Sequence, residues 1–418
     1  MPDRPSNQGL RIGLIGHGFM GRVHALAWRT AEQLYPLPVG PVLAGLAGRD
    51  PERAADAAGQ LGFSMAVADW RQLVDRPDID VIDICTPVGS HAEIASRALA
   101  AGKHVLCEKP LARTTEEARQ LALSAARARQ DGLVAAVGYN YRRLPAIELA
   151  RQFVAEGRIG EIRHIRARYL QDWLARSDHP WSWRLDAAQA GSGALGDIGS
   201  HLIDLMAHVA GLRLYAVTGS LATFVASRSP GPPDGAARRP VTVDDASTFL
   251  GRAQNGVLAV FEASRTALGR KNQLSFELNG SEGTIVFDLE RLNELGWYSG
   301  SDDGSARGFR TILVTEETHP YLKAWWPPGH TLGWDHAFVH QARDFLSAVA
   351  TGQPYVPGFA DGLYVQEVVD AVMLSARTGA WQPVASAGDD AGLVTGAASR
   401  PGAPGVSGPD GGHRNGES

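Results

Sequence analysis

Short apolar runs alternate with longer amphipathic segments through the first third of the chain. The short runs have the length of buried strands and cover residues 11–15, 42–47, 81–85, 104–107 and 133–137. The longer segments have helical spacing and cover residues 20–31 and 51–59, with further helices beginning near residues 91 and 115. Strand–helix alternation is typical of a parallel sheet with helices on both faces. We therefore predict an α/β domain over residues 10–138.

Beyond this domain the apolar runs follow one another through short turns. Predicted strands cover residues 162–170, 215–226, 245–251, 257–263, 273–278 and 284–287. Predicted helices cover residues 144–156, 333–350 and 363–378, and another begins near residue 195. Asn255-Gly256 favours a hairpin turn, and strands joined by short turns indicate antiparallel pairing. We predict a second, α+β domain over residues 139–384, built on an open, mainly antiparallel sheet.

Three segments lack this pattern. Residues 1–9 are polar, and residues 385–418 consist almost entirely of small and polar residues. We expect residues 1–9 to be flexible. Residues 385–418 can bury too little apolar surface to offset their ordering entropy, so we expect them to be disordered. Residues 227–241 are rich in Pro, Gly and Arg, and we predict an exposed loop there.

Composition bears on the number of domains, the partners and the cellular location that we expect. The chain has 418 residues, too many for one ordinary core, which agrees with two domains. Its net charge is -5, so we expect no nucleic-acid partner and no anionic membrane partner. No run approaches the ~20 apolar residues of a membrane helix, and the first residues lack a signal pattern. Cys85 and Cys107 lie in apolar runs, which indicates buried thiols and a cytoplasmic protein.

A glycine-rich turn follows the first predicted strand and opens the first predicted helix. It reads Gly16-His17-Gly18-Phe19-Met20-Gly21, the G-x-G-x-x-G pattern of dinucleotide-binding Rossmann domains. Gly16 permits the tight turn, Gly18 lets a pyrophosphate approach, and Gly21 lets helix and strand pack closely. Free amides at the helix start then face the phosphates. The alternative is a glycine-rich turn without a ligand.

The end of the second predicted strand bears on the choice of cofactor. An acidic residue there normally holds the ribose hydroxyls of NAD, but this chain has Gly48 followed by Arg49. A missing carboxylate beside a guanidinium suits a 2′-phosphate. We therefore predict NAD(P), with NADP slightly favoured over NAD. The alternative is that Arg49 is a solvated loop residue and that Asp50 contacts the ribose.

Four further motifs follow in order. Thr86-Pro87 with His91, Glu108-Lys109-Pro110, and the run 139–143 each close a predicted strand, and Gly193 to His201 opens a later helix. With the glycine-rich turn, this set resembles the Gfo/Idh/MocA oxidoreductase family over residues 10–384. The resemblance implies a Rossmann domain followed by an α/β domain whose open sheet forms the substrate floor and often an oligomer interface. It implies cofactor contacts from Gly16, Gly18, Phe19, Met20, Gly21, Gly48, Arg49, Thr86, Pro87, His91, Glu108, Lys109 and Asn140.

Lys109, Asp197 and His201 are the candidate catalytic residues. Lys109 lies at the carboxyl end of a parallel strand, where it could stabilise an alkoxide; the alternative is a surface lysine. Asp197 and His201 are four apart, which puts them on one helix face. His201 could be the base, with Asp197 or Asp204 orienting it, or Asp197 bonding a substrate hydroxyl. The alternatives are a first-turn acid or a metal pair, but a third ligand of suitable spacing is missing, so we predict no metal.

Polar and aromatic residues suit a sugar ring. The candidate substrate-binding residues are Lys109, Tyr139, Arg142, Tyr169, Gln171, Trp173, Asp197 and His201, with Trp183 and His336 as weaker candidates. Any of them could instead be a core aromatic, a rim charge or a helix-end residue. The resemblance implies a dehydrogenase or reductase acting on a ring alcohol or ketone of a sugar, anhydrosugar or cyclitol, in a homodimer or homotetramer. The alternatives are a glycosidase that uses NAD transiently and a non-enzymatic NAD(P)-binding sensor.

Overall fold

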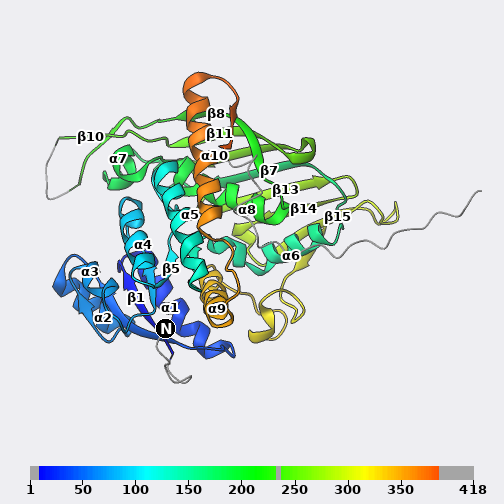
Figure 1. Cartoon of the computed structure of the whole chain (residues 1–418). Helices are drawn as coiled ribbons and strands as arrows, with labels where there is room; N and C mark the ends of the chain where they lie inside the picture. The colour runs from blue at the N-terminus through cyan, green and yellow to red at the C-terminus, as the bar shows by residue number, and fades with distance from the viewer. Residues whose placement is uncertain (1–8, 232–236, 386–418) are drawn as a thin grey trace, which may run out of the picture.

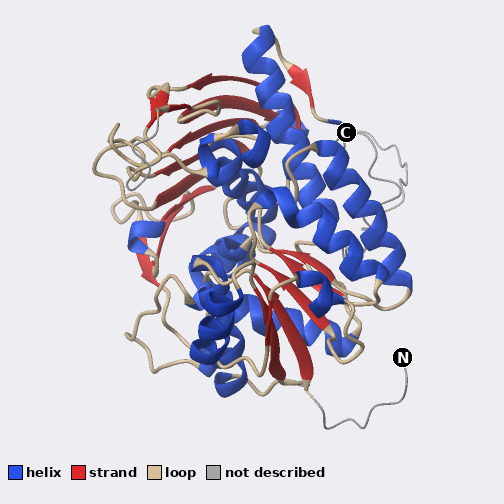
Figure 2. Ribbon diagram, turned by 90° about the vertical axis from the view of Figure 1, so that its left-hand side faces the viewer, coloured by secondary structure: helices blue, strands red, loops and turns tan. Residues whose placement is uncertain are grey.

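The computed structural model describes residues 9–231 and 237–385, and its strands form two large sheets (Figures 1 and 2). Nearly all of residues 1–9 and 385–418, and the middle of the predicted loop 227–241, lie outside the described residues. At the edges of that loop, the two-residue strands β9 (Ser227–Arg228) and β10 (Arg239–Pro240) pair with each other.

The first sheet is six-stranded and parallel, in the order β3-β2-β1-β4-β5-β6. Its strands are β1 (Leu10–Ile15), β2 (Pro41–Ala47), β3 (Ala66–Val67), β4 (Val81–Ile84), β5 (His104–Cys107) and β6 (Ala135–Val137). Its helices are α1 (Phe19–Leu34), α2 (Pro51–Leu61), α3 (Trp70–Val74), α4 (His91–Ala100) and α5 (Thr115–Gln130). The predicted Rossmann architecture is therefore confirmed, with β3 and α3 as additions. The order reverses between β1 and β4, where such sheets bind ligands at their carboxyl ends.

The second sheet has nine strands in the order β16-β15-β14-β13-β7-β12-β11-β8-β17. The strands are β7 (Ile162–Leu170), β8 (Leu214–Ala222), β11 (Ala246–Ala253), β12 (Leu258–Ser264), β13 (Gln273–Gly280), β14 (Gly283–Asp288), β15 (Glu294–Ser299), β16 (Arg310–Leu313) and β17 (Gln382–Pro383). Every neighbouring pair is antiparallel except β7 with β12. The mainly antiparallel prediction is thus confirmed, although β15 to β17 were not predicted and β8 ends four residues early. Asn255 and Gly256 have φ angles of 61° and 77° and turn the chain between β11 and β12, as predicted.

Helices cover one face of this sheet and join the two halves of the molecule. These are α6 (Pro145–Ala155), α8 (Ser200–Ala210), α9 (His336–Thr351) and α10 (Phe359–Thr378); the short helix α7 (Ala187–Ala190) precedes α8. Helices α6, α8 and α10 pack against the sheet, and α10 also lies along α5 (Figure 1). Helix α9 packs on α1, with the ring centroids of Phe345 and Trp28 5.8 Å apart. Helices α9 and α10, from the end of the chain, therefore pack against helices of the first domain. Within the described ranges, no helix meets the length and apolarity that crossing a membrane requires.

Candidate active site

The glycine-rich turn has the shape of a phosphate cradle. Gly16 has a φ of 97°, and a Cβ there would lie 2.8 Å from the Cys85 carbonyl oxygen. A Cβ at Gly21 would lie 2.1 Å from the Gly16 carbonyl oxygen, so neither position accepts a larger residue. Gly18 faces open space and begins α1 without a side-chain cap, which leaves amides near Phe19 and Met20 for an anion. These residues fit the pyrophosphate of a dinucleotide.

Asn140 is a second feature that fits a bound dinucleotide. Its side chain is buried just beyond β6, and its Nδ2 has no hydrogen-bond partner among the described residues. A buried amide without a partner costs free energy unless a ligand completes it. Asn140 therefore suits the polar groups of a bound cofactor.

His91, which was expected at the cofactor, connects two turns of the Rossmann domain. The ring nitrogens of buried His91 lie 2.9 Å from the Pro110 carbonyl oxygen and 2.8 Å from that of Thr86. His91 thus ties the turn after β4 to the turn that carries Lys109, and its expected cofactor contact gains no support. Pro87 is exposed at that turn, and the Thr86 hydroxyl accepts a hydrogen bond from Ser90.

Glu108 belongs to a buried ionic cluster. His24 Nε2 lies 3.1 Å from Glu108 Oε1, and His24 Nδ1 lies 2.9 Å from Asp83 Oδ1. Trp28 Nε1 donates to Asp83, and the Lys109 amide donates to Glu108 Oε2. Burial lowers the pKa of His24, but the attraction of Asp83 outweighs it and the pKa is raised well above 6.5. Glu108 therefore fixes the backbone of Lys109, and its expected cofactor contact stays a prediction.

Lys109 and Asp197 meet across the two domains. Lys109 Nζ donates to the Asp197 carbonyl oxygen at 2.7 Å and lies 3.3 Å from Oδ1, and Asp197 Oδ2 lies 3.5 Å from Arg265 Nη1. Burial raises the pKa of Asp197, but Lys109 and Arg265 outweigh burial and lower it to about 2. The side chains of Lys109 and Asp197 are 16% and 29% exposed, so the pair is open to a ligand.

Asp197 is presented by a π-helical turn, Leu195–Gly199, which leads into α8. The Asp244 carboxylate accepts hydrogen bonds from the amides of Gly193 at 2.7 Å and Leu195 at 2.8 Å. Arg265, which is 1% exposed, donates to the Asp244 carbonyl oxygen. Asp244 and Arg265 therefore position Asp197. Sequence reasoning missed both, because no local pattern connects them with a helix start 50 to 70 residues away.

His201 is enclosed by tyrosines. Its ring centroid lies 5.8 Å from Tyr139, 4.8 Å from Tyr141 and 5.9 Å from Tyr169. Burial, followed by the charge of Lys109, lowers the pKa of His201 well below 6.5, so the ring is neutral. Within the described part of the chain, its ring makes no hydrogen bond. The prediction that an aspartate orients the imidazole therefore gains no support from a hydrogen bond and stays a prediction.

Asp204 has another partner. It accepts two hydrogen bonds from buried Arg142, at 2.9 Å from Nε and 2.5 Å from Nη2. Tyr139 is also buried, at 1% exposure. The predicted substrate contacts of Arg142 and Tyr139 gain no support, because both side chains are buried and Arg142 is paired with Asp204.

Three predicted residues form a connected polar wall. Trp173 Nε1 donates to Gln171 Oε1, and both the Gln171 amide and the Tyr169 hydroxyl donate to Asn272 Oδ1, at 2.8 and 2.7 Å. Asn272 was not anticipated from the sequence. Of the two weaker candidates, Trp183 lies beneath the Arg184 guanidinium, and His336 Nδ1 accepts from the Gly333 amide at the start of α9.

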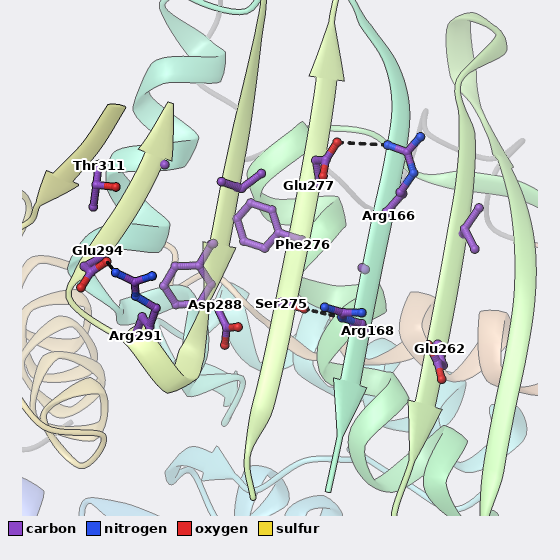
Figure 3. Close-up of a pocket in the computed structure, with 15 residues that line it drawn as sticks. Arg166, Arg168, Glu262, Ser275, Phe276, Glu277, Asp288, Arg291, Glu294 and Thr311 are labelled. Atoms are coloured by element: carbon purple, nitrogen blue, oxygen red, sulfur yellow. Dashed lines mark hydrogen bonds and ion pairs between the residues drawn. The ribbon is translucent and has the colours of Figure 1, made fainter. Parts of the chain in front are cut away.

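The face of the second sheet that the helices leave uncovered carries charged side chains beside a hollow (Figure 3). Side chains alternate along a strand, so Arg166 and Arg168 point away from the helices and from Tyr169. Arg166 pairs with Glu277, and Arg168 donates to Ser275, beside a hollow of about 610 Å³. This surface is separate from the Lys109 site.

Comparison with known proteins identifies the family. Residues 10–139 match an oxidoreductase family with an NAD-binding Rossmann fold, and residues 147–286 match the GFO/IDH/MocA C-terminal domain. The chain belongs to the Gfo/Idh/MocA oxidoreductase family. This confirms the resemblance and makes the protein an NAD-binding oxidoreductase.

Several relatives match this Gfo/Idh/MocA member over nearly their whole length. Levoglucosan dehydrogenase of Pseudarthrobacter phenanthrenivorans is 42% identical over 389 residues, covering 90% of this chain and 98% of the relative. The crystal structure of an oxidoreductase domain protein from Kribbella flavida has 52% identity and a TM-score of 0.88, covering 90% and 99%. A levoglucosan dehydrogenase complex with NADH and levoglucosan has 43% identity and a TM-score of 0.87, also covering 90% and 99%.

Proposed function

We propose that this protein is a dehydrogenase that transfers a hydride between a nicotinamide dinucleotide and a ring alcohol or ketone of a sugar, anhydrosugar or cyclitol. The observation that carries the proposal is the meeting of Lys109, Asp197 and a neutral His201 beside the carboxyl ends of a Rossmann sheet. A cation, a carboxylate and a neutral base within one site are the groups that alcohol oxidation requires.

Each side chain has a part in the reaction. When bound, the nicotinamide supplies the acceptor for the hydride that leaves the substrate carbon. The imidazole of His201 takes the hydroxyl proton, since its lowered pKa keeps it neutral at physiological pH. Lys109 Nζ donates to the substrate oxygen and stabilises its negative charge. Asp197 holds Lys109 in place, and in ketone reduction the same groups return the proton.

The relatives support an anhydrosugar as the first substrate to try, because one of them is named as a levoglucosan dehydrogenase. The wall of Tyr169, Gln171 and Trp173 offers aromatic faces and amides to a polyol ring. The test is to incubate the protein with NAD or NADP and levoglucosan, glucose or myo-inositol, and to follow reduced cofactor at 340 nm. We expect turnover with one of these polyols.

Two other outcomes separate the alternative functions. Release of an aglycone from a glycoside without accumulation of reduced cofactor would indicate a glycosidase. Cofactor binding without turnover of any polyol would indicate a sensor. Retention of Lys109 and His201 favours the dehydrogenase, because a sensor has no need of either.

The cofactor preference, the oligomeric state and the cellular location are proposals as well. A preference for NADP has no support from the relatives, whose complexes contain NADH, and it stays a prediction. We infer a homo-oligomer built on the open sheet face, because Leu250 and Leu258 are exposed there at 37% and 43%. Light scattering should then give a dimer or tetramer.

The free thiols Cys85 and Cys107 support a cytoplasmic location.

A further inference from the structure

The end of β2 has an unusual environment for an NAD-binding protein. Gly48 occupies the position from which a carboxylate normally reaches the adenosine ribose. A Cβ at Gly48 would lie 2.5 Å from His17 Nε2 and 2.6 Å from His17 Cδ2. The imidazole of His17, which comes from within the glycine-rich turn, therefore fills the space that a side chain at position 48 would need.

The neighbouring residues do not restore the missing carboxylate. The Asp50 side chain accepts a hydrogen bond from the Arg53 amide at 3.2 Å and caps the start of α2. One oxygen of the exposed Asp50 carboxylate is thus engaged at a helix terminus. Arg49 is exposed, and its guanidinium has no ion pair within the ranges that the structure describes. Besides the second oxygen of Asp50, the groups open to a ligand here are an imidazole and a guanidinium.

We propose that His17 replaces the missing carboxylate as the side chain that contacts the 2′ position of the adenosine ribose, with Arg49 beside it, so that the protein binds NAD and NADP with similar affinity. This rests on the proposed function only in requiring that a nicotinamide dinucleotide binds. An imidazole can donate to or accept from a ribose hydroxyl. It lacks the negative charge with which a carboxylate repels a 2′-phosphate, and a guanidinium favours that phosphate.

The packing of His17 on Gly48 gives a specific test. NADH and NADPH binding is measured by fluorescence titration without substrate, so that the result is independent of catalysis. We expect wild-type dissociation constants within tenfold of each other. Gly48→Asp alone should weaken both, because its side chain meets the imidazole. The double variant His17→Ala/Gly48→Asp should recover NADH binding and bind NADPH at least tenfold more weakly than NADH.

Single variants keep the test decisive if Gly48→Asp fails to fold. His17→Ala should weaken NADH binding at least threefold, and Arg49→Ala should weaken NADPH binding at least threefold more than NADH binding. Arg129→Ala, an exposed arginine in the last turn of α5, is the matched control and should change neither. If His17→Ala binds both cofactors like the wild type, or the double variant keeps the wild-type ratio, the assignment of His17 is wrong. A wild type that binds neither dinucleotide would overturn the proposed function as well.

Discussion

Replacing Lys109 by methionine separates catalysis from cofactor binding. Methionine keeps most of the length of the side chain and removes the charge. Lys109 Nζ donates one hydrogen bond of 2.7 Å to the Asp197 carbonyl oxygen and one of 3.3 Å to Asp197 Oδ1. Removing one preorganised donor from a developing oxyanion costs about 3–4 kcal/mol, or roughly 100- to 1000-fold in kcat. The glycine-rich turn and Asn140 stay intact, so cofactor affinity should change by less than about threefold.

Steady-state kinetics with the best polyol give kcat, and a separate NADH titration gives the affinity for the cofactor. The matched control is Lys271→Met, because the Lys271 side chain is 79% exposed and its ammonium pairs with Asp172 at 2.7 Å. Exposed ion pairs contribute about 0–1 kcal/mol, so this control should retain wild-type kcat and stability. The reasoning is refuted if Lys109→Met retains more than a tenth of kcat, or if it loses NADH binding as strongly as turnover.

Three further predictions concern the groups around Lys109. Arg265→Met removes the second cation beside Asp197, so the pKa of Asp197 should rise from about 2 and kcat should fall about tenfold, with KM for the cofactor unchanged in steady-state assays. Because burial and Lys109 lower the pKa of His201, kcat/KM for oxidation should stay level as pH falls through 6.5; a half-point at or above 6.5 would contradict a neutral His201 as base. His24→Gln leaves buried carboxylates without a cation and should cost about 3–5 kcal/mol in urea unfolding at pH 6. Since the folded pKa of His24 is raised, its stabilisation is complete below 6.5 and is lost as pH rises through the raised value, so the difference between wild type and variant should shrink at alkaline pH.

The parts predicted from sequence are those that depend on local pattern. The glycine-rich turn was recognisable because its spacing is set by one strand–turn–helix unit. The strand–helix rhythm located the first sheet for the same reason, and Asn255-Gly256 located a hairpin. Lys109 stood out because it ends a parallel strand.

The remaining features depend on contacts between distant segments. Asp244 and Arg265 hold the Asp197 turn from another strand connection, and neither has a local signature. The four-residue spacing predicted that Asp197 would face His201, but in the structure Asp197 lies in a π-helical turn and pairs with Lys109 and Arg265 instead. Strands β15 and β16 escaped notice because Gly, Arg and Glu interrupt their apolar pattern near the edge of the sheet.

The most direct test of the account follows the hydride itself. The protein is incubated with oxidised cofactor and the best polyol carrying deuterium on its ring carbons, and the reduced cofactor is examined by proton NMR. Direct transfer predicts one deuterium at C4 of the nicotinamide for each ketone formed, and none in the Lys109→Met variant on the same time scale. Reduced cofactor without deuterium, or ketone formed without reduced cofactor, would contradict the proposed reaction.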